Sequence, residues 1–403
     1  MVTSVTDDFQ IFIKPVGARC NLRCSYCYYL GKGEVSRPDS NAVMDDGTLE
    51  NYIRQHFSVS SGDTTMFTWH GGEPLLAGID FYKKAVSFQK KYLPPGKSFL
   101  NGIQTNGTLI TKEWCDFFAK NGFSVGISLD GPEIFHNSTR HAYGSADQVC
   151  HFARNEENKT GSFEKVIRGH RLLREHGINP EILCVINAYN VKYPLVIYDF
   201  FKKIGTQYLT FLPLVSHKPD IDASVRGAKQ SVESSEESVP ALAFGHFLSA
   251  IFDEWVKKDI GVIKIQIFEE ALRTAFDQEH SLCIFKEKCG GVPVVERNGD
   301  FYSCDHFVDK SWHLGNINEQ SLTYFLNHPK QKTFGELKQN SLPQYCIKCE
   351  VRNMCNGECP KNRFIVSPDG EPGLNYLCEG YKYFFNHCKP FVNSVAEMWR
   401  QEK

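Results

Sequence analysis

Three cysteines lie within eight residues in the stretch Cys20-Asn21-Leu22-Arg23-Cys24-Ser25-Tyr26-Cys27, with the spacing CxxxCxxC. A structural zinc site and an iron–sulfur cube held by protein alone both need four protein ligands. Three thiolates would leave one iron of a cube free to bind a small molecule, as the open position does in a catalytic zinc site. The stretch therefore predicts a redox enzyme, with half of a zinc site as the alternative.

The composition limits the class of protein. The chain has 403 residues, with 45 basic and 47 acidic side chains, and is long enough for two domains. This balance does not favour nucleic acid or an anionic membrane as a partner. No signal peptide or membrane span is visible, so we expect a cytoplasmic protein. Its fifteen cysteines are then better explained by metal or cluster ligation than by disulfides.

Residues 8–215 alternate between short β-rich runs and amphipathic helices. Helices are expected to end at Gly122, Gly177 and Gly205, because glycine permits a left-handed cap. This alternation favours an α/β fold with a parallel sheet, although periodicity does not separate a partial barrel from a flat sheet. The six predicted strands are Gln10–Lys14, Thr65–Trp69, Phe99–Gln104, Ser124–Leu129, Glu181–Ile186 and Tyr208–Leu212.

The rest of the chain differs in character. Residues 216–240 contain six serines and no aromatic residue, and are predicted to form a solvated loop or lid. A core helix should follow, with an apolar stripe made of Phe244, Phe247, Leu248, Ile251, Phe252 and Trp255. Eight cysteines lie from Cys283 to Cys378, so this part is expected to fold around metal. We predict domains at 1–215, 216–275 and 276–403.

A second motif, His70-Gly71-Gly72-Glu73-Pro74, directly follows the second predicted strand. Its glycines would let the backbone approach a ligand closely, and Glu73 would bring a carboxylate that suits an ammonium group. A tight turn that needs glycine is the alternative. The next two strands end at Asn106-Gly107 and Asp130-Gly131-Pro132, which form turns whatever else they do.

These two motifs together resemble the radical S-adenosylmethionine superfamily. The resemblance implies a partial (β/α)6 TIM-like barrel with its chemistry at the C-terminal strand ends. It implies that Cys20, Cys24 and Cys27 hold a 4Fe–4S cluster whose free iron binds S-adenosyl-L-methionine. The residues that match contacts to this cofactor are Tyr26, Gly72, Glu73, Ser128 and Arg140, of which Arg140 could instead be a surface charge.

The C-terminal run CxxCxxxxxCxxxC, followed by a distant cysteine, resembles the SPASM domain, which holds two auxiliary 4Fe–4S clusters. The resemblance assigns Cys283, Cys289, Cys304 and Cys359 to the first, and Cys346, Cys349, Cys355 and Cys378 to the second. Three 4Fe–4S clusters are therefore implied, whereas spacing alone leaves two four-cysteine zinc sites open. Cys115 and Cys184 are expected to be ordinary buried thiols, and Cys150 and Cys388 receive no role.

Nearly the whole chain resembles the anaerobic sulfatase-maturating enzymes. The similar segments are Lys14-Pro15, Cys20–Leu30, Trp69–Gly78, Gln104–Ile110, Val125–His136 and Asn375–Tyr381. The resemblance implies oxidation of a cysteine or serine in a Cys/Ser-x-Pro-x-Arg motif of a sulfatase polypeptide to Cα-formylglycine. It also implies an electron donor such as flavodoxin or ferredoxin.

The same resemblance gives roles to individual side chains. Asp305 matches the residue that takes a proton from the target, with an exposed hairpin carboxylate as the alternative. Tyr29 and Gln104 match residues that line the peptide substrate. Two features depart from the group: His70 stands where glutamine is usual, and residues 141–160 look like a surface insertion.

Two other functions remain open at this point. One is a SPASM-type maturase that installs a thioether or carbon–carbon link in another peptide. The other is a zinc-stabilised binding module without turnover. The sequence does not decide between cysteine and serine as the target.

Overall fold

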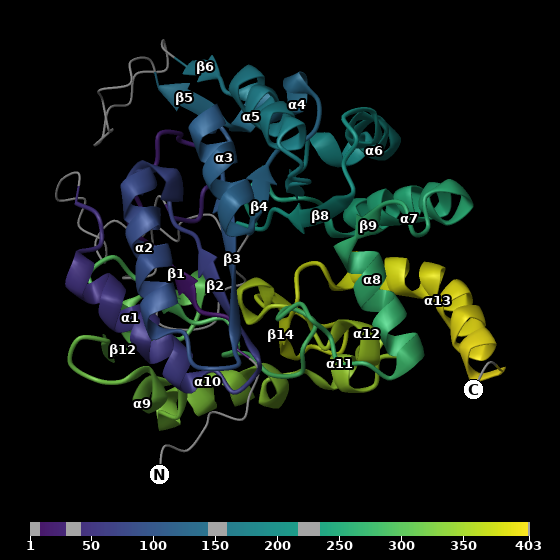
Figure 1. Cartoon of the computed structure of the whole chain (residues 1–403). Helices are drawn as coiled ribbons and strands as arrows, with labels where there is room; N and C mark the ends of the chain where they lie inside the picture. Colours follow the sequence, from purple (N-terminus) through teal and green to yellow (C-terminus); the bar gives the residue numbers. More distant parts are fainter. Residues whose placement is uncertain (1–8, 30–41, 144–158, 217–233, 402–403) are drawn as a thin grey trace. The chain divides into compact units, whose positions relative to one another are not determined.

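The structure is a computed structural model that describes residues 9–29, 42–143, 159–216 and 234–401. The chain divides into two compact units, whose elements are labelled in Figure 1. The first unit comprises the chain up to Leu129, His136–Pro180 and Gly290–Gly335. The second comprises Asp130–Phe135, Glu181–Cys289 and the chain from Glu336 onward.

Seven strands of the first unit are hydrogen-bonded in the order β12-β11-β10-β1-β2-β3-β4. Strands β1 to β4 pair parallel in succession, as predicted, and β10 pairs parallel with the other side of β1. A segment from late in the chain, which we expected to belong to a C-terminal domain, thus joins the first strand. The strands are β1 (Phe12–Ile13), β2 (Thr64–Trp69), β3 (Ser98–Thr105), β4 (Phe123–Ser128), β10 (Val294–Val295), β11 (Asp300–Tyr302) and β12 (His313–Asn316).

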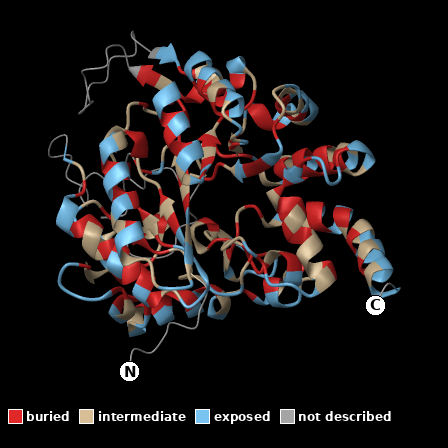
Figure 2. Cartoon of the chain, in the orientation of Figure 1, coloured by how far each residue is buried: buried red, intermediate tan, exposed pale blue. Residues whose placement is uncertain are grey.

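The helices of the first unit are amphipathic. In Figure 2, α1 and α2 carry buried residues on one side and exposed residues on the other, as expected for helices that cover a sheet. Helix α3 ends at Gly122 with φ +65°, which confirms the predicted left-handed cap. The main helices are α1 (Asp46–Val59), α2 (Ile79–Tyr92), α3 (Lys112–Asn121) and α5 (Phe163–Glu175), with α9 (Leu322–Leu326) and the 3-10 turns η1 (Pro74–Ala77) and η5 (Asp305–Phe307) between them.

The second unit contains the last two predicted strands, β7 (Glu181–Ile186) and β8 (Tyr208–Pro213), followed by β9 (Lys264–Ile265), all parallel. Its helices are α6 (Pro194–Lys203), α7 (Ala241–Lys258), α8 (Gln266–Arg273), α11 (Gln344–Ile347), α12 (Arg352–Cys355) and α13 (Cys378–Gln401). Helix α10 (Pro329–Asn340) and helix α4 (Glu133–Thr139) each begin in one unit and end in the other.

Helices α7 and α13 lie side by side (Figure 1). All six residues of the predicted apolar stripe on α7 are buried, which confirms it as a core helix. The two helices approach through glycine: a Cβ atom on Gly245 would lie 2.5 Å from the carbonyl oxygen of Gly380. This close packing fixes the beginning of α13, where Cys378 lies.

Some predictions fall outside the described residues. These are residues 217–233 of the predicted loop, residues 144–158 of the predicted insertion, and Cys150. Within the part that is described, no helix is both long and apolar enough to cross a membrane. The fourteen cysteines there form no disulfide; Cys115 and Cys184 are buried in α3 and β7, as predicted.

Candidate functional site

The three N-terminal cysteines lie in the loop that follows β1. Backbone N–H groups of Arg23 and Ser25 donate to carbonyl oxygens of His141 and Thr139, each at 2.9 Å, and so hold this loop in place. Burial raises the pKa of the Cys20 thiol well above its usual value, and charge on Glu73 and on the other two cysteines raises it further. Cys24 and Cys27 therefore both lie near enough to Cys20 to influence its charge.

The two glycines after β2 pack directly against this loop. A Cβ atom on Gly72 would lie 2.1 Å from the carbonyl oxygen of Arg19, so no larger residue fits there. The Gly72 and Glu73 N–H groups donate to the carbonyl oxygens of Gly17 and Arg19, both at 2.8 Å. One physical role of the glycines is therefore to position the segment that leads into Cys20.

Glu73 is fully buried and joins the ends of two strands. Its carboxylate accepts hydrogen bonds from Leu75 N (3.0 Å), Thr105 Oγ1 (2.7 Å) and Asn106 N (2.7 Å). Burial raises its pKa to about 7, although these hydrogen bonds favour the charged form. The Asn106 amide also lies 3.7 Å from Cys20 Sγ, so Glu73 stabilises the cysteine loop through its neighbours.

Other residues predicted to bind the cofactor or the substrate lie in the same unit. Gln104 Nε2 donates to Ser128 Oγ at 3.2 Å. The Arg140 side chain is buried rather than on the surface, and its guanidinium carbon lies 5.3 Å from the centre of the Tyr26 ring. Arg140 Nη1 also lies 3.9 Å from Cys24 Sγ. Arg140 is therefore a buried cation beside the cysteine loop.

Asp305 begins the turn η5, next to Cys304, and is buried, with 7% of its surface exposed. The exposed-hairpin alternative is therefore wrong. Its carboxylate forms an ion pair with Lys14 Nζ at 2.5 Å and accepts a hydrogen bond from the Tyr28 hydroxyl at 2.5 Å. Two residues near the start of the chain thus hold a carboxylate from its last third.

The charges around Asp305 keep it ionised. Burial alone would raise its pKa, but the Lys14 ammonium outweighs burial and, with His70 and His306, holds the pKa below its usual value. Lys14 is itself fully buried; its Nζ lies 3.4 Å from His70 Nδ1. An ionised carboxylate is what a general base requires.

Sequence reasoning gave Lys14 and Tyr28 no role in the site. Lys14 does leave a signal, because it ends the apolar run Ile11-Phe12-Ile13, where a buried lysine must find a partner. Tyr28 leaves none. Tyr29, which we expected to line the substrate, is buried, and its hydroxyl donates to Glu296 Oε1 at 2.5 Å.

Seven of the eight cysteines predicted to bind auxiliary clusters lie in the second unit. Four of them line one pocket, and they are the set predicted for the second auxiliary cluster: Cys346, Cys349, Cys355 and Cys378. Burial raises the pKa of Cys378 to about 12, and charge on Cys346 and Cys349 adds to this effect. The remaining three are Cys283, Cys289 and Cys359, whereas Cys304 belongs to the first unit.

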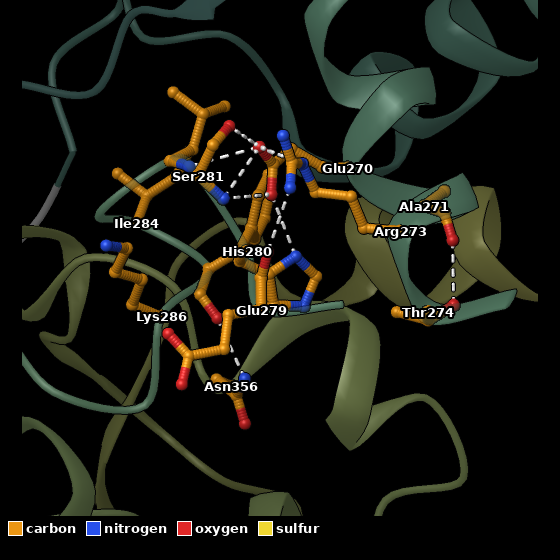
Figure 3. Close-up of polar contacts among 12 residues, drawn as sticks. Glu270, Ala271, Arg273, Thr274, Glu279, His280, Ser281, Ile284, Lys286 and Asn356 are labelled. Atoms are coloured by element: carbon orange, nitrogen blue, oxygen red, sulfur yellow. Dashed lines mark hydrogen bonds and ion pairs between the residues drawn. The ribbon is translucent and has the colours of Figure 1, made fainter. Parts of the chain in front are cut away.

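The loop that carries Cys283 is held from several sides (Figure 3). The Glu270 carboxylate lies 2.8 Å from His280 Nδ1 and accepts hydrogen bonds from the N–H groups of Ser281 and Leu282, each at 3.1 Å. Asn356 Nδ2 donates to the carbonyl oxygen of Phe285 at 2.8 Å. The hydrogen bonds with Glu270 and Asn356 therefore fix the position of this loop.

The arrangement of the thiols fits iron–sulfur clusters. In the described part of the chain, no three His, Cys, Asp or Glu side chains are grouped as ligands of a single metal ion would be. In a cube each thiolate binds a different iron, so its ligands do not need to converge on one point. Four cysteines around one pocket are a suitable donor set for such a cluster.

Two family models match the chain. The radical SAM superfamily matches residues 15–193, and an iron–sulfur cluster-binding domain, SPASM, matches residues 289–350. A serine-type anaerobic sulfatase-maturating enzyme from Bacteroides thetaiotaomicron is 43% identical over 96% of this chain and 91% of its own length. The chain belongs to the anaerobic sulfatase-maturating enzymes.

Further members of this family agree. The serine-type enzyme from Klebsiella aerogenes is 33% identical over 97% of this chain and 89% of its own. The cysteine-type enzyme from Clostridium perfringens is 29% identical over 96% of this chain and 98% of its own. A solved structure, native anSMEcpe with bound AdoMet and Cp18Cys peptide, matches with a TM-score of 0.81 and 28% identity, covering 97% of this chain and 99% of that one.

These matches confirm the predicted radical SAM fold, an α/β architecture of mainly parallel strands with a C-terminal SPASM domain. They also confirm a radical S-adenosylmethionine oxidoreductase of the sulfatase-maturating type, with iron–sulfur clusters and S-adenosylmethionine as cofactors. A zinc-stabilised module without turnover is therefore wrong.

Proposed function

We propose that this anaerobic sulfatase-maturating enzyme oxidises a serine in a Ser-x-Pro-x-Arg motif of a sulfatase polypeptide to Cα-formylglycine, and accepts cysteine as a second target. The observation that carries the proposal is the buried carboxylate of Asp305, kept ionised by Lys14. Serine is favoured because serine-type relatives are 43% and 33% identical to this chain, against 29% and 31% for cysteine-type relatives.

The cofactors are three 4Fe–4S clusters and S-adenosylmethionine. Cys20, Cys24 and Cys27 would hold the cluster that binds S-adenosylmethionine. The auxiliary clusters would be held by Cys283, Cys289, Cys304 and Cys359, and by Cys346, Cys349, Cys355 and Cys378. The pocket lined by the last four cysteines supports the second of these auxiliary clusters.

Further residues are assigned to cofactor and substrate. Tyr26, Gly72, Glu73, Ser128 and Arg140 would contact S-adenosylmethionine. Tyr29 and Gln104 would line the peptide site. Residues 1–215 would form the radical SAM core, 216–275 the connection, and 276–403 the SPASM domain.

The reaction removes one hydrogen atom from Cβ, one proton from the hydroxyl oxygen and one electron, and leaves an aldehyde. When bound, S-adenosylmethionine and the clusters supply the radical that takes the hydrogen atom and the acceptor for the electron. Asp305 takes the hydroxyl proton on its carboxylate. Lys14 keeps that carboxylate charged, and Tyr28 fixes its orientation through the 2.5 Å hydrogen bond.

Two associated predictions remain. The electron donor would be a flavodoxin or ferredoxin. The enzyme would act in the cytoplasm.

The test uses anaerobically reconstituted enzyme, S-adenosylmethionine, dithionite and two peptides that differ only in serine or cysteine at the target. Mass spectrometry should show that the serine peptide loses two hydrogens and gains an aldehyde. Formation of 5′-deoxyadenosine with no change in either peptide would reject sulfatase maturation. A new cross-link within the peptide would instead indicate a maturase of another type.

A pair of variants tests the base. Asp305→Asn should leave S-adenosylmethionine binding intact and lower aldehyde formation by about 10²–10⁴-fold, the usual contribution of a general base. Asp80→Asn is the control, because that side chain is 84% exposed on α2. An unchanged aldehyde yield in Asp305→Asn would remove Asp305 from this role.

A further inference from the structure

Lys338, on helix α10, is a fully buried lysine in the middle of the cysteine-rich loops. Its ammonium donates to the carbonyl oxygens of Cys283 (2.9 Å), Ile284 (2.7 Å) and Lys286. All three acceptors are neutral. Among the residues that the structure describes, Lys338 forms no ion pair with a carboxylate.

A buried ammonium is costly unless an anion accompanies it. The three carbonyl groups solvate the charge of Lys338 but do not neutralise it. The one buried acid nearby, Glu358, is engaged elsewhere: its carboxylate accepts from the amides of Asn375 (2.5 Å) and Asn362 (3.1 Å). The Glu358 carboxylate still interacts with the charge of Lys338, and so do the thiols of Cys283, Cys289 and Cys359.

A second cation shows the same pattern. The guanidinium of Arg363 donates to the carbonyl oxygens of Lys338 (2.5 Å), Gly357 (2.8 Å) and Asn356 (3.1 Å), and interacts with the thiols of Cys346, Cys289 and Cys355. Two cations and one carboxylate thus lie among these loops. A negatively charged cluster held by these cysteines would add to Glu358 in balancing Lys338 and Arg363.

We propose that Lys338 is the counter-ion of the auxiliary cluster assigned to Cys283, Cys289, Cys304 and Cys359, and that it raises the reduction potential of this cluster. The inference rests on the cluster assignment made under the proposed function. Reduction adds negative charge to a cluster, so a nearby fixed cation stabilises the reduced state, and burial strengthens this effect. Lys338 would thereby help this cluster accept the electron released by the substrate.

The position of the loop does not depend on Lys338 alone. Glu270 holds the N–H groups of Ser281 and Leu282, and Asn356 holds the carbonyl oxygen of Phe285 (Figure 3). A change at Lys338 should therefore alter the charge beside the cluster and leave the loop in place.

The experiment compares three variants in a background where Cys20, Cys24 and Cys27 are alanine, so that only auxiliary clusters are filled. Lys338→Met removes the charge, Lys338→Arg keeps it, and Lys332→Met changes an exposed lysine on the same helix. Iron and sulfide content are measured, followed by an anaerobic redox titration monitored by electron paramagnetic resonance. We expect Lys338→Met to shift one midpoint potential to a more negative value, while Lys338→Arg and Lys332→Met stay close to the parent.

Each other outcome has a defined meaning. If the cluster is lost in Lys338→Met but not in Lys338→Arg, Lys338→Gln, which keeps a hydrogen-bond donor without the charge, decides: cluster loss there as well supports a counter-ion, and a retained cluster with an unshifted potential overturns it. Cluster loss in both variants, or unchanged potentials in Lys338→Met, overturns the proposal. A parent protein without any auxiliary cluster would overturn the cluster assignment as well. The peptide assay is separate, so failure of formylglycine formation with potentials that depend on Lys338 would reject only the proposed function.

Discussion

Replacing Lys14 with methionine tests how strongly the buried ion pair holds the active carboxylate. The change removes the ammonium 2.5 Å from Asp305 and keeps an apolar chain of similar length beneath the Tyr29 ring, whose centre lies 4.1 Å from the Lys14 Nζ atom. The Lys14 side chain is 0% exposed and that of Asp305 is 10% exposed. Little water can therefore reach the Asp305 carboxylate to replace the stabilisation that the Lys14 ammonium gives it.

The magnitude follows from this burial. An exposed ion pair contributes about 0–1 kcal/mol, whereas removing one partner of a buried pair costs about 3–5 kcal/mol. The hydrogen bond from Tyr28 to Asp305 remains in the variant and partly solvates the carboxylate. We therefore expect the free energy of unfolding to fall by about 3 kcal/mol, at the low end of the range for a buried pair.

The effect also depends on pH. The folded protein lowers the pKa of Asp305 below its ordinary value of 3.8. The ion pair therefore stabilises the wild type fully above that value and is lost as the pH falls below it. In Lys14→Met the effect of burial is unopposed by lysine, so the pKa of Asp305 rises, and the pH at which the enzyme becomes active should rise with it.

The assay is a double-mutant cycle of wild type, Lys14→Met, Asp305→Asn and the double variant. Urea unfolding is followed by tryptophan fluorescence under anaerobic conditions at matched iron content, with the dependence on urea concentration required to stay constant. The double variant should lose less stability than the two single variants together, because no unpaired charge remains. A loss below about 1 kcal/mol in Lys14→Met, or strict additivity, would refute the reasoning.

Three other predictions concern stability and cluster loading. Burial lowers the pKa of His56 to about 3 in the folded protein. Below the ordinary histidine pKa of 6.5, unfolding therefore takes up a proton at His56, and the free energy of unfolding should fall by about 1.4 kcal/mol for each pH unit. His56→Gln should remove this contribution when urea unfolding at about pH 5 is compared with about pH 7. Gly72→Ala places Cβ 2.1 Å from the Arg19 carbonyl oxygen, which should cost about 1–3 kcal/mol and reduce N-terminal cluster iron, whereas Gly102→Ala, with nothing within 4 Å, should do neither. Glu270→Gln should lower the free energy of unfolding by about 1–3 kcal/mol and reduce auxiliary iron, because the N–H groups of Ser281 and Leu282 then lose carboxylate oxygens that accept their hydrogen bonds. An equal iron content would contradict this.

Much of the fold could be predicted from local sequence. The strands are short β-rich runs in which buried and less buried residues alternate, and all six predicted strands are present, with ends within a few residues of the predicted ones. The helix end at Gly122 needs only a residue that tolerates a positive φ. What local sequence did not reveal is the pairing of β10 with β1, because two short strands far apart in the chain carry no register signal of their own.

The candidate site divides in the same way. The spacing of Cys20, Cys24 and Cys27 and the Gly-Gly-Glu turn identify the chemistry from sequence alone, because both motifs act within a few residues of chain. The burial of Asp305 and its contacts with Lys14 and Tyr28 could not be predicted, because these contacts join segments that are at least 277 residues apart in the chain. The spacing of residues along the chain therefore identified which reactive groups this protein carries. Only long-range packing decided which of them are buried together, and the charged neighbours that each group meets there set its ionisation.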